Sequence, residues 1–473
     1  MSTTIESRPP GTGVVERRTP AAAGGMRRSF VPTITEARPY RRWYVATSHR
    51  FGIAFAVATL WAGASLWLSR PWISDLAEHI TLVPALLLVT FVALVPGHLV
   101  AFLATGMLLD RHPPLIALHP TVPVTVLVAA RNEAATITET LDYLAAQDYD
   151  GDLRIYLVDN GSTDGTSDVA RTAAARNGAN LTVLHQTRAG KNFALNTGLA
   201  HLDTEIVVTV DADTLLHRSA IRMLVARMLS SPADVLAVAG DLMVRNSRDG
   251  FWARLQVWDY LLGIAAVKRV QGLFQGTLVA QGAFSAYRAE ALRKVEGWPA
   301  AIGEDIVLTW KLLQFGRVYY EPLALGFTGV PTTLRQLTQQ RSRWARGMLE
   351  GLQAVPPWVQ HRRTVRALAM VDVAIPFLDL AYVAAWVPGI VLACFGCFWV
   401  VGPMTLAVIP MTLALYGLMY RRQKRQVLHP LGLRPRRDAV AFLLFLTIYQ
   451  VFMSAMSVRG YTQHAMRRKH TWK

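Results

Sequence analysis

The chain has 473 residues, of which 52% are hydrophobic and 17% are charged, and its formal net charge is +17. Ordinary soluble domains carry about 25% charged residues. Long apolar segments here flank a polar middle, which excludes a wholly soluble protein, a disordered chain and a disulfide scaffold. Both cysteines, Cys394 and Cys397, lie in an apolar run, and we interpret them as small buried hydrophobic residues rather than as a redox or zinc site.

The positive charge is concentrated beside the apolar segments. Arginines crowd residues 8–50, Arg421–Arg437 and Arg459–Lys473. The positive-inside rule produces this distribution at the cytoplasmic face of a membrane. We therefore predict a multipass protein of the plasma membrane with its polar middle in the cytoplasm. Nucleic-acid binding, the alternative that a basic chain suggests, is not expected.

The first 110 residues predict an arm followed by two membrane spans. Residues 1–50 are rich in Pro, Gly, Arg and Thr and show no helical or strand period, which is typical of a disordered cytoplasmic arm. Residues 51–110 contain two apolar runs, Phe51–Ser69 and Ile80–Leu109, each long enough for a transmembrane helix. We expect the second run to kink or to protrude at Pro96-Gly97. A cleavable signal peptide is not expected, because the first apolar run begins far from the N-terminus.

Residues 111–330 predict an α/β domain. Helical stretches over Ala134–Gln147 and Thr166–Arg176 alternate with short β-branched runs. Four such runs are evident: Val122–Ala130, Leu153–Asp159, Asn180–His185 and Glu205–Val210. Alternation of this kind favours a Rossmann-like, mostly parallel sheet with helices on both faces. Ligands bind such sheets at the carboxyl ends of the strands.

The remaining residues return to the membrane. Residues 331–366 predict amphipathic interfacial helices, and residues 367–458 about three transmembrane helices. Ala367–Tyr420 is long enough for two of them, with an interfacial piece near Asp372 and Asp379, and Ala439–Val458 for the third. An odd number of spans would place the basic tail, 459–473, outside the cell and against the charge rule. The sequence leaves open whether the last segment re-enters.

Acidic side chains follow three of the predicted strands. Asp211-Ala212-Asp213 follows the strand EIVVTV, where two carboxylates can offer hard oxygen ligands to Mg²⁺ or Mn²⁺ and so hold a substrate diphosphate. The alternative is a turn that caps the next helix. Asp159 ends another strand and can accept the imide N–H of a uracil ring, although a plain turn also fits. Arg131-Asn132-Glu133 occupies the matching place after the first strand.

Two helix starts carry charged residues. Gly190-Lys191 lacks the other residues of a phosphate loop, but Lys191 opens a helix where a cation and free N–H groups can hold phosphate. Gly303-Glu304-Asp305 precedes an apolar helix. There a carboxylate can act as a general base on an acceptor hydroxyl, or both acids can merely favour the helix N-terminus through its dipole.

Gln340-Arg341-Ser342-Arg343-Trp344 lies in an amphipathic helix. Such a helix can simply rest on the lipid surface with Trp344 as its anchor. Arg343 can also clamp a diphosphate, and the flat face of Trp344 can stack on a sugar ring.

The order of these motifs resembles the processive family 2 membrane glycosyltransferases, which include cellulose, chitin, hyaluronan and poly-N-acetylglucosamine synthases. Residues 240–292 and the runs GEDIVLTWKL, VYYEPLAL and QQRSRWARG are most similar to bacterial poly-β-1,6-N-acetylglucosamine synthases. The resemblance implies a cytoplasmic GT-A domain of the α/β class. It also implies inverting transfer from a UDP-sugar, by preference UDP-N-acetylglucosamine, to a growing polysaccharide that is extruded across the membrane.

The same resemblance implies roles for individual residues. Asp159 would contact uridine, Lys191 and Asp211 the diphosphate, and Asp213 a Mg²⁺ or Mn²⁺ ion. Asp305 would be the base, with Glu304 beside it as a second catalytic acid. The other expected substrate contacts are Asn132, Glu133, Gln281, Gln340, Arg343 and Trp344. Membrane lipid and a small accessory membrane protein are the further partners that we consider.

The chain also departs from the family pattern. Many relatives carry a second acid where this chain has Asn160, and Val279–Ser285 lacks the cysteine-containing motif of cellulose, chitin and hyaluronan synthases. Three alternatives therefore stay open: a non-processive glycosyltransferase acting on a lipid carrier, a synthase of the chitin, hyaluronan or cellulose type, and a transporter or scaffold that has lost catalysis.

Overall fold

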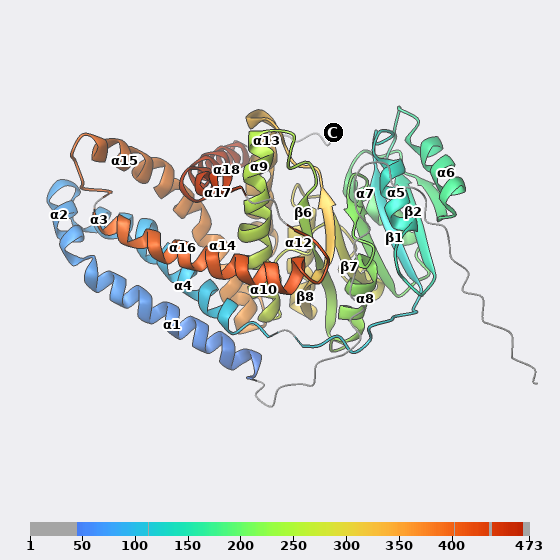
Figure 1. Cartoon of the computed structure of the whole chain (residues 1–473), viewed down its shortest axis with the longest axis horizontal. Coiled ribbons are helices and arrows are strands. Elements are labelled where there is room, and N and C mark those ends of the chain that lie inside the picture. Colours follow the sequence, from blue (N-terminus) through green and yellow to red (C-terminus); the bar gives the residue numbers. More distant parts are fainter. Residues whose placement is uncertain (1–44, 112, 402, 435–437, 467–473) are drawn as a thin grey trace, which may run out of the picture.

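An α/β domain and a set of apolar helices lie at opposite ends of the long axis of the molecule (Figure 1). The computed structural model describes residues 45–111, 113–401, 403–434 and 438–466. Most of the arm expected over residues 1–50 lies outside the described residues, as do positions 435–437 of the basic loop and positions 467–473 of the basic tail.

The sheet of the α/β domain has eight described strands in the order β3-β2-β1-β4-β7-β6-β8-β5. Their bounds are β1 (Val124–Ala130), β2 (Leu153–Asp159), β3 (Asn180–His185), β4 (Ile206–Asp211), β5 (Leu215–Leu216), β6 (Val235–Val244), β7 (Phe284–Arg288) and β8 (Arg317–Thr328). The four predicted strands are confirmed as β1 to β4, which pair in parallel. β7 and β5 run against their neighbours, so the sheet is mixed, although most of its strands share one direction.

Helices cover both faces of this sheet. They are α5 (Ile137–Ala145), α6 (Thr166–Asn177), α7 (Lys191–Ala200), α8 (Ala220–Leu229), α11 (Ala289–Lys294) and α12 (Glu304–Phe315). Successive side chains of a strand point to opposite faces, and β1 shows the consequence. Val126 and Val128 pack into a core with Leu141 of α5, whereas Leu127 packs into a second core with Leu195 of α7. The predicted α/β layering is therefore confirmed.

Four helices among the described residues are long and apolar enough to cross a membrane: Thr47–Leu68, Leu82–Leu108, Arg363–Cys394 and Ala439–Ala465. They are built from α1 (Thr47–Leu68), α3 (Leu82–Val89), η1 (Thr90–Leu94), α4 (Val95–Leu108), α14 (Arg363–Ala381), η4 (Tyr382–Trp386), α15 (Val387–Cys394), α17 (Ala439–Leu444), η6 (Phe445–Tyr449) and α18 (Gln450–Ala465). Between 11% and 28% of their most apolar windows is buried. Helices that expose this much apolar surface indicate a membrane protein.

The second apolar run is distorted close to the expected position. The π-helical turn η1 directly precedes α4, in which Pro96 stands at the first turn. A proline lacks the backbone N–H that an α-helix requires, so the preceding turn loses a hydrogen bond and widens. The structure thus places a π-helical turn just before Pro96 within one continuous helix, Leu82–Leu108, and the expected kink or protrusion stays a prediction.

Asp372 and Asp379, near which an interfacial piece is expected, lie in the continuous helical run Arg363–Cys394. Asp379 is buried there, and Tyr461 of α18 donates a hydrogen bond to it over 2.7 Å. This partner satisfies the carboxylate, so the helix need not break around the acid. A further helix, α16 (Pro403–Gln423), follows, and it is continued by η5 (Lys424–Leu428).

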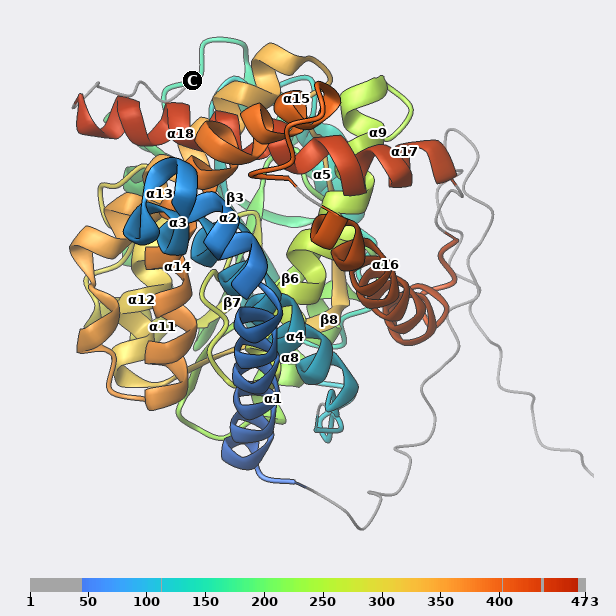
Figure 2. The same cartoon turned by 90° about the vertical axis from the view of Figure 1, so that its left-hand side faces the viewer.

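Two helical segments join the sheet to the apolar helices. One is the run α9 (Phe251–Trp258), η2 (Asp259–Ile264) and α10 (Ala265–Leu273), inserted between β6 and β7. The other is α13 (Leu334–Ala354), which begins at a capping box formed by Thr333 and Gln336. Figure 2 looks from the side of the apolar helices, with α1, α2 (Arg70–Ile80) and α4 in front of the sheet. A short turn, η3 (Pro357–Val359), connects α13 to α14.

Candidate active site

Asp159 is held in a fixed orientation at the end of β2. Its carboxylate accepts hydrogen bonds from the backbone N–H of Ser162 at 2.9 Å and from the Ser167 hydroxyl at 2.5 Å. Burial acts to raise the pKa of Asp159, but these hydrogen bonds and nearby His185 outweigh burial and lower it below its usual value. The carboxylate is therefore ionised and keeps lone pairs for a further donor such as an imide N–H.

Asn160 fixes the loop that leads to Lys191. Its amide nitrogen donates to the carbonyl oxygens of Gln186 (3.0 Å) and Arg188 (2.8 Å), and its amide oxygen accepts from the N–H of Gly190 (2.7 Å). Only 2% of the residue is exposed. An aspartate could not donate to either carbonyl, which gives a structural reason for an asparagine at this position.

Asn132 and Glu133 connect the loops that follow β1 and β2. The side-chain oxygen of Asn132 accepts from the N–H of Thr163 at 2.9 Å, and Asn132 adopts a positive φ of 56°. The Glu133 carboxylate accepts a hydrogen bond from the Thr136 hydroxyl at 2.7 Å. The backbone N–H of Glu133 donates to the Thr166 hydroxyl. The side-chain oxygen of Asn132 is thus used within the protein, while the Glu133 carboxylate keeps lone pairs for another ligand.

Lys191, at the first position of α7, bridges two acids. Its Nζ lies 2.5 Å from Asp211 Oδ1, at the end of β4, and 3.9 Å from Glu304 Oε1, at the start of α12. Burial acts to lower the pKa of Lys191, but the charges of Asp211 and Glu304 outweigh it and raise the pKa above its usual value. Burial raises the pKa of Glu304 to about 7, although Lys191 opposes this shift. The sheet therefore gathers a cation and two acids from three separate elements.

Asp213 lies beyond Asp211, and burial together with the charges of Asp211 and Glu133 raises its pKa to about 6. Within the described residues, no group of three or more His, Cys, Asp or Glu side chains could hold a metal ion. The donor set still fits Mg²⁺ or Mn²⁺ when a bound diphosphate supplies the other oxygens, because such ions take few protein carboxylates and keep waters. A divalent cation would also relieve the repulsion among the three acids.

Asp305 stands at the second position of α12 and faces the turn between residues 281 and 284. Its Oδ2 accepts from the N–H of Gly282 at 3.4 Å, and its Oδ1 accepts from the N–H of Ile306 at 2.9 Å. The N–H of Asp211 donates to the carbonyl of Ala283 at 3.2 Å. One turn therefore contacts both the strand-end acid and the predicted base.

Gln281 begins this turn, and its side-chain amide is occupied by protein partners. Its Oε1 accepts a hydrogen bond from Nζ of Lys268, and its Nε2 donates to the carbonyl of Gly240 at 2.9 Å. Both ends of the Gln281 amide are thus bound within the protein, and the substrate contact that the resemblance implies for Gln281 stays a prediction.

The helix α13 brings Gln340, Arg343 and Trp344 near the start of α12. A Cβ atom on Gly303 would lie 2.7 Å from the Cα of Gly347, so the two segments nearly touch. Residues four apart share a helix face, which puts Arg343 on the side of Gly347. Gln340 Oε1 is buried without a hydrogen-bond partner in the described part of the chain, and Trp344 is 37% exposed.

Arg341, between these residues, points the other way. Its guanidinium lies 4.2 Å from the centroid of the Trp344 ring and donates to Asp259 of η2 at 2.7 Å and to Tyr449 of η6 at 3.3 Å. These contacts hold Arg341 between the Trp344 ring, the joining run at η2 and the apolar helix at η6. The QRSRW motif thus combines residues that face the site with one that anchors the helix.

Sequence reasoning missed Asn160, Lys268 and Asp259 as organisers of this site. Lys268 and Asp259 lie in the run VWDYLLGIAAVKRV, where charges interrupt apolar residues. Charges inside an apolar helix are costly unless they are paired. That interruption was the available signal, although it does not say which partners the two charges find.

Comparison with known proteins identifies relatives of the middle of the chain. Residues 120–347 match the family model described as glycosyltransferase like family 2. Poly-β-1,6-N-acetyl-D-glucosamine synthase of Staphylococcus aureus (strain COL) is 33% identical over 226 residues, which are 47% of this chain and 54% of that protein. The synthase of Staphylococcus epidermidis is 31% identical over 226 residues, which are again 47% of this chain and 54% of that protein. The chain spans about half the length of the curated relatives it matches.

A solved structure resembles a larger part of the chain. It is the mannosyltransferase PcManGT from Pyrobaculum calidifontis in complex with GDP-Man and Mn²⁺. The TM-score is 0.57 and the identity 23%, over 81% of this chain and 99% of that one. At this identity the likeness shows the fold alone. The expected GT-A-like α/β arrangement is confirmed in this coarse form, as a mixed sheet.

Proposed function

We propose, from the match of residues 120–347 to the family model described as glycosyltransferase like family 2, that this chain is a membrane-embedded, inverting and processive glycosyltransferase. It polymerises a UDP-sugar, by preference UDP-N-acetylglucosamine, into a β-linked polysaccharide and passes it through the membrane. One observation carries the proposal. Lys191 lies 2.5 Å from Asp211 and 3.9 Å from Glu304, so groups suited to the donor diphosphate adjoin the GED segment that carries the base.

The donor half of the site binds the nucleotide. The ionised carboxylate of Asp159 accepts the imide N–H of uracil. Lys191, with the free N–H groups at the start of α7, pairs with the diphosphate. Lys191 must exchange part of its contact with Asp211 for this new anion, which a flexible ammonium can do.

Asp213, supported by Asp211 and Glu133, would hold a divalent cation on the diphosphate. Mn²⁺ accompanies the donor sugar in the structure of PcManGT, which supports this assignment. When bound, such a cation supplies charge neutralisation for the departing nucleotide.

The acceptor half performs the proton transfer. Asp305 accepts the proton of the acceptor hydroxyl, whose oxygen forms a bond to the anomeric carbon of the donor sugar. The bond from that carbon to the diphosphate breaks at the same time, UDP leaves, and the configuration inverts. The N–H of Gly282 holds one carboxylate oxygen of Asp305, and the other is held by Ile306, so the base is oriented before the acceptor arrives.

The acceptor then meets the helices of the membrane. Gln340 and Arg343 face the start of α12, and the exposed face of Trp344 stacks on a sugar ring at the entrance of the polymer path. The four apolar helices support a multipass arrangement with the glycosyltransferase domain on the cytoplasmic side, where the basic segments lie. Lipid surrounds these helices.

The test uses the purified full chain in nanodiscs with Mg²⁺ or Mn²⁺ and a panel of UDP-sugars, with GDP-mannose as an additional donor. UDP release and product length are followed. Long polymer from UDP-N-acetylglucosamine alone, cleaved by a β-1,6-specific hydrolase, supports the proposal. Polymer from UDP-glucose or UDP-glucuronate would change the substrate, addition of a single sugar would indicate a lipid-modifying enzyme, and no turnover of any donor would overturn the proposal.

A further inference from the structure

A buried lysine lies directly behind the predicted base. Lys268, on α10, is 9% exposed, and its Nζ donates a hydrogen bond to Oε1 of Gln281. The other end of that amide donates to the carbonyl of Gly240 on β6 at 2.9 Å. The Gln281 side chain is therefore clamped between a helix and a strand and has little freedom to rotate.

This clamp acts on a turn that contacts the reacting groups. The N–H of Phe284 donates to the carbonyl of Gln281 at 3.2 Å and closes the turn. Within it, Gly282 donates to Asp305, and Ala283 accepts from Asp211. A Cβ atom on Gly282 would lie 3.1 Å from Nζ of Lys191. A movement of Gln281 would thus displace the hydrogen-bond donor of Asp305.

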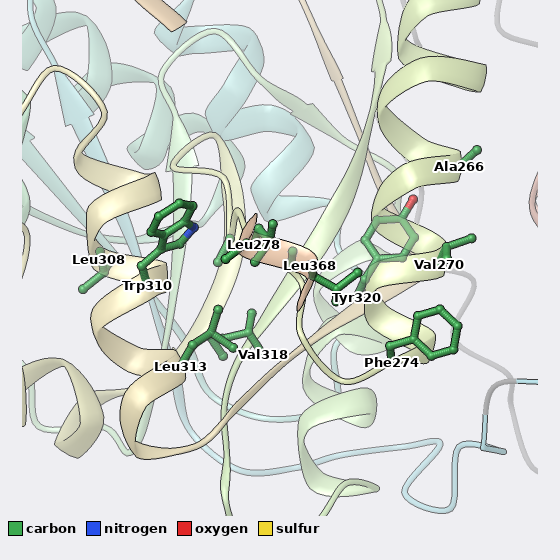
Figure 3. Close-up of a cluster of buried hydrophobic side chains, with 14 of the residues drawn as sticks. Ala266, Val270, Phe274, Leu278, Leu308, Trp310, Leu313, Val318, Tyr320 and Leu368 are labelled. Atoms are coloured by element: carbon green, nitrogen blue, oxygen red, sulfur yellow. The ribbon is translucent and has the colours of Figure 1, made fainter. Parts of the chain in front are cut away.

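The packing of α10 does not require a charge at this position. Ala266 and Val270 of this helix, with Phe274 directly after it, pack in one core with Tyr320 and Val318 of β8 (Figure 3). An apolar side chain of similar volume would often serve stability as well as a buried ion does or better. A lysine with its ammonium beside the site is therefore better explained by its contacts than by the core.

The charged and titratable groups around Lys268 come from three elements. Asp305 of α12 and Asp241 of β6 are the acids whose charges stabilise its ammonium. Asp241 is 2% exposed and also lies near the hydroxyl of Tyr320 on β8. Arg269, the next residue on α10, instead binds Asp110 at the end of the second apolar run, 2.6 Å away. The side chain of Lys268 thus points to the candidate site, and that of the adjacent Arg269 points to the apolar helices.

We propose that Lys268 is a positioning residue for glycosyl transfer: through Gln281 it keeps the turn at residues 281–284 in place, so that the carboxylate of Asp305 stays directed at the acceptor hydroxyl. The inference rests on the proposed function, in which Asp305 is the base. Lys268 does not itself contact the donor or the acceptor.

The experiment compares Lys268→Met, Lys268→Arg and the wild-type full chain in nanodiscs. Transfer is followed by UDP release with the best donor, and UDP affinity is measured by calorimetry in the presence of Mn²⁺. We expect Lys268→Met to lower kcat by about 10- to 100-fold, because a small misplacement of a catalytic group has effects of this size. UDP affinity should stay within about 2-fold of wild type, and Lys268→Arg should recover most of kcat. Lys294→Met, at an exposed position on α11, is the matched control and should change neither quantity.

The pH profile separates positioning from packing. Burial lowers the pKa of Lys268 to about 8, although Asp305 and Asp241 oppose this shift. The ammonium is therefore charged below this pH and neutral above it. We expect wild-type kcat to fall as the pH rises through about 8, and the Lys268→Arg profile to extend to higher pH, because arginine keeps its charge.

Three outcomes would overturn the inference. If the wild-type chain makes polymer and Lys268→Met matches its kcat and pH profile, the inference alone fails. If UDP affinity and thermal midpoint fall together with kcat in both variants, Lys268 serves only the fold. If the wild-type chain turns over no donor, the proposed function fails and the inference with it.

Discussion

The two halves of the sheet hold their loops in different ways. In the half made of β1 to β4, neighbouring loops are joined by hydrogen bonds of side chains to nearby backbone, such as those of Asp159 and Asn160. In the half made of β6 to β8, ion pairs join elements that are distant in sequence. Arg227 pairs with Glu321 at 2.7 Å, and Arg269 pairs with Asp110 at 2.6 Å. Arg341 of the helix α13 pairs with Asp259 at 2.7 Å.

Under the proposed function, this difference separates the half that would bind the donor, β1 to β4, from the half that would bind the acceptor. The donor half contains its own supporting contacts, so its geometry depends little on the apolar helices. The acceptor half is joined to them at the end of α4 through Asp110 and at η6 through Tyr449. Under the proposed function, these contacts would keep the acceptor site in register with the helices along which a polymer would leave.

The sharpest test of the comparison removes the base from the acceptor half alone. Asp305→Asn should lower kcat by about 10²- to 10⁴-fold, the usual contribution of a general base, while UDP affinity stays close to wild type. Single-turnover transfer and calorimetry measure the two quantities. Asp213→Asn is the donor-half counterpart and should weaken binding of UDP in the presence of Mn²⁺. An Asp305→Asn chain with normal turnover contradicts the assignment.

Breaking a buried ion pair in the acceptor half should lower the stability of the folded protein. Asp110→Asn leaves the charge of Arg269 without its carboxylate partner, and removing one member of a buried pair costs about 3–5 kcal/mol. The thermal midpoint of the full chain in nanodiscs measures the loss. Asp168→Asn removes an exposed pair with Arg171 and, as the matched control, should change stability by less than about 1 kcal/mol. Equal effects of the two variants would contradict the role of burial.

A substitution at Asn160 should act on the donor half. Asn160→Asp turns two donated hydrogen bonds into repulsion between the carboxylate and the carbonyl oxygens of Gln186 and Arg188, at a cost of about 1–3 kcal/mol. The loop before Lys191 should loosen, so the KM for the donor rises several-fold while kcat for bound donor changes little. Steady-state kinetics with varied UDP-sugar measures both. An unchanged KM would show that this loop does not set the position of Lys191.

The smallest expected effect concerns the acceptor path. Trp344→Ala removes an aromatic face that is 37% exposed, and the loss of such a stacking contact is worth about 0.5–1.5 kcal/mol. We expect shorter products with nearly normal initial UDP release, measured by gel separation of labelled polymer. Trp358→Ala, at a 63% exposed position beyond α13, should leave product length unchanged. Identical product lengths for all three chains would remove Trp344 from the path.

The donor half was predictable because its strands are continuous β-branched runs and its helices lie between them in sequence. The strands of the other half gave no comparable signal. β6 contains Ala and Gly within VLAVAGDLMV, and β8 contains Pro322. β7 also runs antiparallel between β4 and β6, so it joins the sheet through pairings with distant segments rather than through a local pattern.

The predicted site residues divide in the same way. Strand-end and helix-start positions bring Lys191, Asp211 and Glu304 together, because parallel strands end at one edge of a sheet. The environment of Gln281 was not predictable. Its partner Lys268 lies on a helix inserted between strands, and only the packing of that helix on β8 decides which way the lysine points.

By itself, the sequence determined the α/β class, the parallel strands β1 to β4, the apolar helices and the acids and lysine at element ends, because hydrophobic period and strand-end position are local properties. The tertiary structure alone decided the mixed strand directions, the clamp on Gln281 and the ion pairs to Asp110 and Asp259. Each of these depends on segments far apart in the sequence that meet in a buried space. A charge in such a space is costly unless it is paired.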